Sequence, residues 1–359
     1  MTVVRVPGRV NLIGDHTDYH GGLALPMAID RWCEIGAAPI DERVVHATSA
    51  RFEGSVTVLL DTPVDPGAVE PTWGRFVVGA VAALQDAGVR VEGAELAISS
   101  TVVPGAGLSS SAALAVALTL ALGPEHEADV VARAELARDA EQRATGVTIG
   151  LMDQLTVLAA RAGHALLIDF DTLAIEPVPL PGDLAILVMH SGTARSLAGS
   201  AYASRRADGE AVAAQLGLAS LRHATVDQVA HLPRARHVVR ENERVAAAVD
   251  ALRVGDFVRV GELMLASHAS LRDDYEVSTP ELDSLVDALM RSGAWGARLT
   301  GAGFGGCVVA IASVRDARDV LADATAAYGA ATGLTANGFV ARSVDGALTH
   351  AGDIHTGDA

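Results

Sequence analysis

Val103-Pro104-Gly105-Ala106-Gly107-Leu108-Ser109-Ser110-Ser111-Ala112-Ala113 leads directly into an apolar run, 114–122, that ends at Gly123-Pro124. Two glycines and three consecutive serines therefore precede a segment rich in alanine and leucine. The pattern predicts a loop followed by a helix, with the serines at the helix N-terminus. Residues 96–102 are typical of a strand, so the local order is strand, loop, helix.

The start of this helix is a candidate anion site. A helix N-terminus offers unpaired backbone N–H groups and the positive end of the helix dipole. Glycines just before it let the backbone approach a phosphate closely. The alternative is an ordinary core helix capped by one serine. Three serines behind a Gly-x-Gly turn exceed what a cap needs, so the phosphate-binding interpretation is favoured.

The basic residues narrow the chemistry further. The chain has no lysine, and all 27 of its basic residues are arginine. A Walker-type phosphate loop and a protein-kinase site each require a lysine, so both are excluded. Phosphate chemistry in this chain must rely on backbone amides, hydroxyls, arginine and a metal ion.

Length and composition indicate a large globular protein. The 359 residues favour two domains or one large one, and half of the residues are hydrophobic. The formal net charge of -17 argues against nucleic-acid binding. The N-terminal residues lack a signal-peptide core, and no apolar run reaches the roughly 18 residues of a membrane span. Two cysteines without paired spacing, Cys33 and Cys307, fit a reducing cytosol, so we expect a cytoplasmic protein.

A second polar cluster lies near the N-terminus, in the segment from Gly8 to Tyr19. Arg9, Asp15, His16 and Asp18 stand there among apolar residues. Closely spaced donors and acceptors suit a polyhydroxylated ligand. A solvated loop with a local Arg–Asp pair is the alternative, and the segment alone leaves both open.

Three further residues are candidates on weaker grounds. Glu141 falls in the last turn of a predicted helix, where a carboxylate opposes the helix dipole and is a candidate to hold a cation, or is simply solvated. Asp153 falls in the first turn of the next helix, where the dipole stabilises it. Trp73 is a core residue or flanks an aromatic ligand such as a base, and the core is the more frequent outcome.

Hydrophobic periodicity and turn residues predict the remaining elements. A domain boundary is expected at 177–181, where prolines alternate with other residues. Gly301–Gly306 matches the dinucleotide-binding pattern of glycines, but a strand pattern follows it rather than a helix, so that class of fold is rejected. The glycines are instead interpreted as a close-approach loop. Expected strands cover 3–6, 23–34, 43–47, 165–169, 184–189, 307–312 and 338–344, and expected helices cover 76–81, 127–144, 200–214 and 316–328, with one starting at 150, several within 237–271 and one starting at 280.

Six segments in order resemble the galactokinases, a branch of the GHMP kinases. The segment from Gly8 to Tyr19 resembles the galactokinase signature, Pro104–Ala112 the GHMP phosphate loop and Leu299–Cys307 the third GHMP motif. The three others are Met152-Asp153-Gln154, Ser200-Ala201-Tyr202 and the segment from Leu271 to Ser278. The resemblance covers nearly the whole chain. It implies a two-domain α+β GHMP kinase fold, with an N-terminal ribosomal-protein-S5-domain-2-like domain and a C-terminal ferredoxin-like domain.

The resemblance also implies a reaction, ATP-dependent phosphorylation of the C1 hydroxyl of D-galactose, and a set of site residues. Asp153 would be the base, with Arg9 beside it. Ser111 and Glu141 would place Mg²⁺, and Trp73 would lie by the adenine. The sugar would be held by Asp15, His16, Thr17, Asp18, Gly150 and Tyr202, and the ATP phosphates by Gly105, Ala106, Gly107, Leu108, Ser109, Ser110 and Ser111.

The expected organisation is an N-terminal domain over 1–178, a C-terminal domain over 179–346 and a mobile tail over 347–359, with the active site between the domains. Sugar and ATP are the expected partners, without nucleic acid or membrane, and the protein is expected to be a monomer or weak dimer. Asp15 stands where the family usually has glutamate, and the arm before Arg9 is shorter than usual. The alternatives are therefore a related kinase for an amino sugar, pentose or deoxysugar, and a sugar sensor without turnover.

Overall fold

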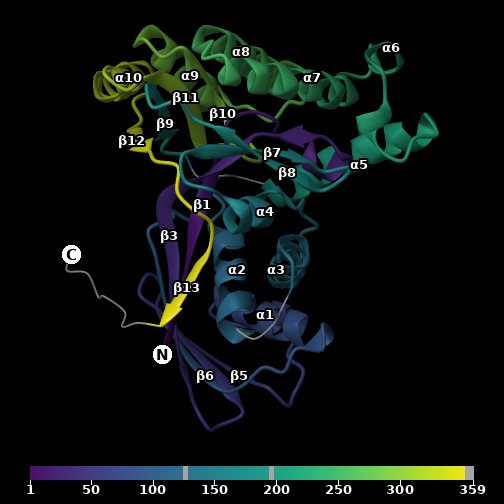
Figure 1. Cartoon of the computed structure of the whole chain (residues 1–359), viewed down its shortest axis with the longest axis vertical. Coiled ribbons are helices and arrows are strands. Elements are labelled where there is room, and N and C mark those ends of the chain that lie inside the picture. The colour runs from purple at the N-terminus through teal and green to yellow at the C-terminus, as the bar shows by residue number, and fades with distance from the viewer. Residues whose placement is uncertain (124–127, 194–197, 352–359) are drawn as a thin grey trace.

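The computed structural model describes residues 1–123, 128–193 and 198–351. Within these ranges the chain forms two layered halves that meet at a small third sheet (Figure 1). Helices and strands are mixed in both halves, as the predicted α+β class requires.

The N-terminal half is built on a six-stranded sheet with strand order β13-β1-β3-β6-β4-β5. Helices α1, α2 and α4 pack against it, α3 packs on these helices, and valine, leucine and alanine side chains from sheet and helices form the core. The strands are β1 (Thr2–Asn11), β3 (Pro26–Pro39), β4 (Val44–Ser49), β5 (Ser55–Leu59), β6 (Ala94–Ser100) and β13 (Leu348–Ala351). The helices are α1 (Gly74–Asp86), α2 (Ser110–Leu122), α3 (Val130–Thr145) and α4 (Met152–Ala159), with a short 3₁₀ turn, η2 (Pro66–Ala68).

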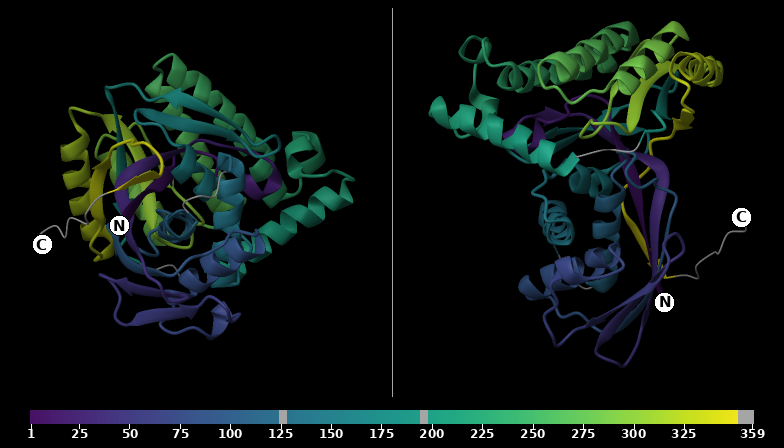
Figure 2. Two further views of the ribbon diagram at one scale, coloured as in Figure 1. Left: turned by 60° about the horizontal axis from the view of Figure 1, so that its bottom comes forward. Right: turned by 180° about the vertical axis from the view of Figure 1, so that it is seen from behind.

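The C-terminal half is built on an antiparallel four-stranded sheet with order β10-β11-β9-β12. Its strands, taken in chain order, follow the arrangement of the predicted ferredoxin-like domain. Helices α7 to α10 lie together at this end of the molecule in Figure 1 and Figure 2. The strands are β9 (Leu184–His190), β10 (Gly296–Leu299), β11 (Cys307–Ser313) and β12 (Asn337–Ala341), and the helices are α5 (Ala198–Gln215), α6 (Val226–Val229), α7 (Pro233–Arg253), α8 (Phe257–Asp273), α9 (Pro280–Arg291) and α10 (Ala317–Thr332).

A three-stranded sheet, β2-β7-β8, lies between the two halves. Its core is continuous with residues of both, because Val10 and Met27 of the first half share one apolar cluster with Val188 and Val249 of the second. The division at 178/179 falls at the end of β8 and stays a prediction. The strands are β2 (Leu23–Ala24), β7 (His164–Asp169) and β8 (Ala174–Pro179), and two 3₁₀ turns, η1 (Asp18–His20) and η3 (Leu221–His223), complete the described elements.

The first strand is longer than the sequence predicts. β1 does not stop at Val6 but runs to Asn11, with a change of register against β3 between Pro7 and Gly8. Arg9 therefore lies on a strand rather than in a loop, and its N–H donates to the carbonyl of Leu108, 3.1 Å away. This bond fastens the glycine-serine loop to the end of β1.

The segment expected to be a mobile tail begins instead with an ordered strand. β13 pairs antiparallel with β1, with Leu348 opposite Arg5 and Ala351 opposite Thr2. The expectation is therefore wrong for these residues, because the open edge of β1 offers them a full set of backbone partners. Residues 352–359 lie outside the described part of the chain.

Some helix boundaries agree closely with the sequence, but α1 runs well beyond the predicted 76–81 and α7 starts at Pro233, before the predicted 237–271. α9 starts at Pro280, and the side chain of Thr279 accepts a hydrogen bond from the N–H of Leu282, a standard cap. α3 ends at Gly146, which takes the left-handed conformation. The predicted start of α3 at Glu127 lies outside the described residues. Among the described residues, none of the helices combines the length and the apolar character needed to cross a lipid bilayer.

We expect Gly79→Ala to destabilise the protein, because α1 and α3 touch backbone to backbone at this glycine. A Cβ at position 79 would lie 2.4 Å from the carbonyl oxygen of Ala140. Moving α3 away to relieve the clash should lower the free energy of unfolding by about 1–3 kcal/mol, as overpacking typically does. Urea denaturation measures it. Gly182→Ala is the matched control, since nothing lies within 4 Å of a Cβ there, and equal loss in both variants would contradict the expectation.

Candidate active site

Arg9 and Asp153 form the central pair of the site. Arg9 comes from the end of β1 and Asp153 from the first turn of α4. The Arg9 Nε and Nη2 atoms lie 2.7 Å and 2.6 Å from Asp153 Oδ1. The third guanidinium nitrogen, Nη1, donates to the carbonyl of Gly107 at 2.6 Å. One buried cation therefore ties the carboxylate to the glycine-serine loop.

Ser109 holds the other oxygen of the same carboxylate. Its hydroxyl donates to Asp153 Oδ2 and makes no capping bond to the backbone of α2. Its backbone takes the left-handed conformation, with φ of 60°, which costs a non-glycine residue about 1–2 kcal/mol. The interpretation of the serines as ordinary helix caps is therefore wrong for Ser109, since its hydroxyl faces the carboxylate.

The carboxylate of Asp153 lines a cavity of about 210 Å³. The loop of residues 12–22, which we call the signature loop, forms one wall, and α4, α5 and the loop between β10 and β11 form others. The sequence-predicted residues that line the cavity are Arg9, Asp15, His16, Asp18, Ser111, Glu141, Gly150, Asp153 and Tyr202. Residues separated by almost 200 positions thus meet in one small space.

Asp18 and Gly150 fit each other closely in this cavity. A Cβ on Gly150 would lie 1.6 Å from Asp18 Oδ2, so only glycine leaves room for the carboxylate. Asp18 accepts hydrogen bonds from the backbone of Tyr19 and Met152. Burial, followed by repulsion from Asp153, raises the pKa of Asp18 to about 6. Besides these two backbone donors, the carboxylate of Asp18 can accept a hydrogen bond from a ligand in the cavity.

Aromatic rings close the side of the cavity next to the signature loop. His16 Nδ1 lies 2.6 Å from the hydroxyl of Tyr19, which in turn lies 3.0 Å from the hydroxyl of Tyr275. The ring of Tyr202 lies 5.8 Å from that of His16. Burial lowers the pKa of His16 well below its usual range and raises the pKa of Tyr202 well above its own, so both rings are neutral at physiological pH.

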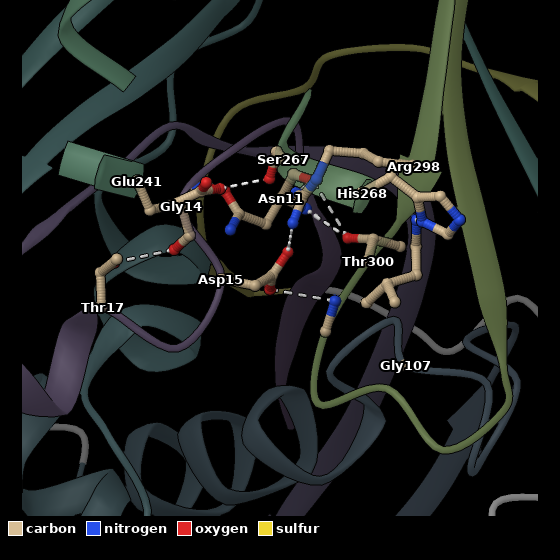
Figure 3. A network of polar contacts seen from close by, with 12 residues as sticks. Asn11, Gly14, Asp15, Thr17, Gly107, Glu241, Ser267, His268, Arg298 and Thr300 are labelled. Carbon is tan, nitrogen blue, oxygen red and sulfur yellow. Dashed lines mark hydrogen bonds and ion pairs between the residues drawn. The ribbon is translucent and has the colours of Figure 1, made fainter. Parts of the chain in front are cut away.

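Asp15 lines the cavity, but its carboxylate is engaged from behind by the C-terminal half. Arg298 Nη2 lies 2.7 Å from Asp15 Oδ2, and the N–H of Gly301 donates to Oδ1 at 3.1 Å. Figure 3 shows Arg298 reaching from β10 toward the signature loop. Arg298 is fully buried and also donates to the carbonyl of Asn11. The shorter side chain of Asp15 therefore connects the signature loop to the third motif.

Thr17 does not line the cavity. Its hydroxyl donates to the carbonyls of Gly14 and Leu23, at 2.9 Å and 2.8 Å, and the residue is fully buried. Because the hydroxyl of Thr17 bonds to two backbone carbonyls, it stabilises the conformation of the signature loop. We therefore reassign Thr17 from substrate binding to support of the loop.

Glu141 fits a role in holding a divalent cation. Its side chain interacts with the hydroxyl of Ser111, and Gln154 Nε2 donates to its Oε2 at 2.7 Å. Burial raises the pKa of Glu141 to about 7. No group of three or more histidine, cysteine or acidic residues that could hold a metal occurs among the described residues. Such a sparse oxygen set suits Mg²⁺, which usually takes one or two protein ligands and completes its shell with phosphates and water.

A second cavity, of about 450 Å³, opens on the other side of the α2 N-terminus. Trp73 and Phe76 line it, as do Ser110 and Ser111. Ser111 lines both cavities, so the two spaces meet at the first turn of α2. Trp73 is 8% exposed and its indole N–H donates to the carbonyl of Glu53 at 3.3 Å, so it belongs to the core and to the cavity wall at once.

The remaining residues of the predicted phosphate loop contribute backbone rather than side chains. The side chains of Ala106 and Leu108 are buried in the protein. Gly105 and Gly107 have φ of 73° and 85°, and a Cβ on Gly105 would meet nothing within 4 Å. Left-handed residues at every second position, Gly105, Gly107 and Ser109, allow neighbouring backbone N–H groups to turn toward a common point, as in an anion-binding concavity.

Gly301 and Ala302, from the loop interpreted as a close-approach loop, line the first cavity. Sequence reasoning assigned no individual role to three other residues that the structure brings to the site. Gln154 and Tyr19 line the first cavity, and Arg298 braces Asp15 from outside it. The one local signal was Arg298 itself, since a charged residue inside an apolar strand pattern indicates a buried partner. The partner could not be named, because it lies 283 positions earlier in the chain, at Asp15.

The two halves have the topologies of the GHMP kinases, and the site combines a glycine-serine loop with the carboxylate of Asp153, as expected for that class. Models of that class match the chain at both halves, as "GHMP kinases N terminal domain" over residues 75–161 and "GHMP kinases C terminal" over 248–330. A solved mevalonate kinase, 20% identical, shares the fold with a TM-score of 0.69.

Within that class the chain belongs to the galactokinase family. The "Galactokinase galactose-binding signature" matches residues 2–39. The galactokinase of Roseiflexus sp. (strain RS-1) is 43% identical over 96% of this chain and 92% of its own length, and that of Mycobacterium tuberculosis (strain ATCC 25618 / H37Rv) is 42% identical over 88% and 90%. The solved Lactococcus lactis galactokinase complexed with galactose is 31% identical, with a TM-score of 0.90 over 96% of this chain and 94% of that one.

We expect Asp18→Asn to stabilise the ligand-free protein above pH 6. The folded protein keeps the Asp18 proton up to about pH 6, whereas the unfolded chain loses it near the usual pKa of 3.8. The contribution of Asp18 to the free energy of unfolding therefore falls by about 1–3 kcal/mol as the pH rises from about 4 to about 6. Asparagine cannot ionise, so the variant escapes this loss.

Urea denaturation between pH 4 and 8 measures the difference between variant and wild type. The exposed aspartate Asp319 on α10 provides the control, and Asp319→Asn should follow the wild-type curve. A constant gap between Asp18→Asn and wild type across the pH range would contradict the assignment.

Proposed function

We propose that this chain transfers the γ-phosphoryl group of ATP to the C1 hydroxyl of D-galactose. The observation that carries the proposal is the junction at Ser111, where the cavity that holds Asp153 meets the cavity lined by Trp73. A sugar in the first space and a nucleotide in the second would face each other across the N-terminus of α2. Membership of the galactokinase family supports the choice of substrates.

Asp153 orients the attacking hydroxyl and accepts its proton. Both of its oxygens are fixed, by Arg9 and by Ser109, so the carboxylate is pre-positioned before the sugar arrives. The transition state of phosphoryl transfer is loose, so the hydroxyl oxygen begins to bond to phosphorus before its proton passes to Asp153.

The other lining residues bind the sugar and exclude water. Asp18 accepts a hydrogen bond from a sugar hydroxyl, and Gly150 provides the space in which it does so. Asp15, His16 and Tyr202 complete the wall, and the neutral His16 and Tyr202 rings can donate as well as accept. A hydroxyl-rich ligand needs this mixture of donors and acceptors.

The glycine-serine loop binds the phosphates through its backbone. The N–H groups at the start of α2 and the left-handed turns at Gly105, Gly107 and Ser109 supply donors where a lysine would stand in other kinases. Trp73 lies beside the adenine. Glu141 and Ser111 would hold Mg²⁺, which would neutralise charge on the transferring phosphates.

Asp15 supports a second candidate function, phosphorylation of a different sugar. Its carboxylate is bound by Arg298 and the N–H of Gly301. The side chain of Asp15 is one methylene shorter than the glutamate usual in the family, so it reaches about 1.5 Å less far, the length of one C–C bond. A site that loses one hydrogen bond to its ligand can change preference among sugars. A sensor without turnover is less well supported, because Asp153 and the serines around it are intact. The cytoplasmic location and the monomeric or weakly dimeric state remain predictions.

We expect the purified protein to phosphorylate D-galactose faster than any other sugar in a panel that includes amino sugars, pentoses and deoxysugars. The assay couples ADP release to a spectroscopic signal at fixed ATP and Mg²⁺. Faster turnover of another sugar, with little on galactose, would favour the second candidate. Binding of sugars without any ADP release would favour the sensor.

We expect Asp153→Asn to lower kcat at least about 10³-fold while sugar affinity falls far less, because the amide can still hydrogen-bond to Arg9 and Ser109 but has no charge to pair with Arg9 and cannot accept a proton. Steady-state kinetics and calorimetric titration with galactose measure the two effects. Asp287→Asn, an exposed change on α9, is the control and should match wild type. Loss of galactose binding in parallel with activity would show that Asp153 has a structural role instead.

A further inference from the structure

One face of α5 lies along the signature loop. Tyr202, Arg206 and Gly209 are spaced by four and three positions, so they share that face. The ring of Tyr202 lies 5.2 Å from that of Tyr19, and the guanidinium of Arg206 lies 6.0 Å from the same ring. Gly209 lies one turn further along and contacts His20. The helix that carries Tyr202 is thus in contact with the loop over about two turns.

The contact between Gly209 and His20 leaves no room for a side chain at position 209. A Cβ there would lie 2.2 Å from Cε1 and 2.4 Å from Nε2 of the imidazole ring. Glycine inside a helix costs about 1 kcal/mol relative to alanine. The close approach of the ring explains why α5 carries a glycine here in spite of that cost.

His20 is a buried residue of the signature loop. It is 2% exposed and ends η1, the turn that begins with Asp18. Its N–H donates to the carbonyl of Thr17 at 3.0 Å, and its ring packs 4.6 Å from that of Tyr19. The imidazole therefore acts as a rigid spacer that belongs to the same turn as Asp18.

Other contacts also hold α5 in place. Arg205 donates to the carbonyls of Tyr275 and Glu276, at 2.7 Å and 3.1 Å, which anchors the middle of the helix to the segment after α8. Tyr202 and Arg206 also contact the ring of Tyr19, and the approach of Gly209 to His20 is the tightest of the contacts between this face of α5 and the signature loop. Neither Gly209 nor His20 lines the cavity that holds Asp153.

We propose that Gly209 and His20 form a positioning pair for sugar binding. The imidazole fills the space left by the absent side chain, and this fit sets how closely Tyr202 approaches the sugar across from Asp18. The proposal rests on the proposed function, because it takes Tyr202 to contact the sugar. It predicts that substrate affinity depends on a contact made outside the substrate cavity.

The first test is Gly209→Ala. The added methyl group must push α5 away from His20, so we expect KM for galactose to rise about tenfold, while kcat and KM for ATP stay within about twofold, since a small misplacement of a binding group is enough for such a loss. Ala207→Gly, on the exposed side of the same helix, is the control and should keep the wild-type KM. An unchanged or lower KM in Gly209→Ala would overturn the proposal.

The second test is rescue. Removing the ring in the double variant His20→Ala/Gly209→Ala restores the space, so KM for galactose should fall back to within about threefold of wild type, below that of Gly209→Ala alone. The same pair is measured for coupling in urea denaturation, where the clash should appear in Gly209→Ala and largely disappear in the double variant. Additive losses in both measurements would show that the two residues act independently and would overturn the proposal.

The two proposals fail in different ways. If wild type phosphorylates galactose and Gly209→Ala does so with the same KM, only the positioning pair is wrong. If wild type prefers another sugar, the proposed substrate is wrong, and the KM comparison is made with that sugar. If wild type turns over no sugar, the proposed function is wrong and the positioning role falls with it.

Discussion

The ion pair between Arg9 and Asp153 is the constraint on which the site depends. Arg9 comes from a strand of the six-stranded sheet, Asp153 from the start of α4, and the same guanidinium also holds the carbonyl of Gly107. Removing the carboxylate would leave the buried cation of Arg9 without its counter-charge. Arg9, with Ser109, therefore fixes the sheet, the glycine-serine loop and the carboxylate of Asp153 relative to one another.

The signature loop is braced from the opposite side by the C-terminal half. Arg298 pairs with Asp15, and Glu241 of α7 accepts from the N–H of Gly14 at 3.0 Å (Figure 3). Burial by itself would raise the pKa of Glu241, but Arg244, which holds the other carboxylate oxygen, and His237 and Arg298 outweigh it and lower that pKa to about 2. Glu241 therefore stays charged inside the protein because it has partners. The sugar would bind to a loop that both halves hold in place.

Local patterns revealed the chemistry of the site, and the structure revealed its pairings. The glycine-serine loop and the strand after Gly306 could be predicted, because caps, dipoles and periodicity act over a few residues. The role of Asp153 was implied only by the resemblance to the galactokinases. The contacts of Asp15 with Arg298 and of Gly209 with His20 could not, since each joins residues that only the folded chain brings together. Thr17 shows the converse limit: a polar residue inside a binding motif can serve the loop itself.

The pairing of β13 with β1 has a consequence for how the protein forms during synthesis. The strand nearest the beginning of the chain waits for a partner that is made more than 330 residues later. At a ribosomal rate of about 5–20 residues per second, that edge stays uncovered for tens of seconds. Nascent chains therefore expose the edge of β1, and chaperones or neighbouring nascent chains can bind this edge until β13 emerges.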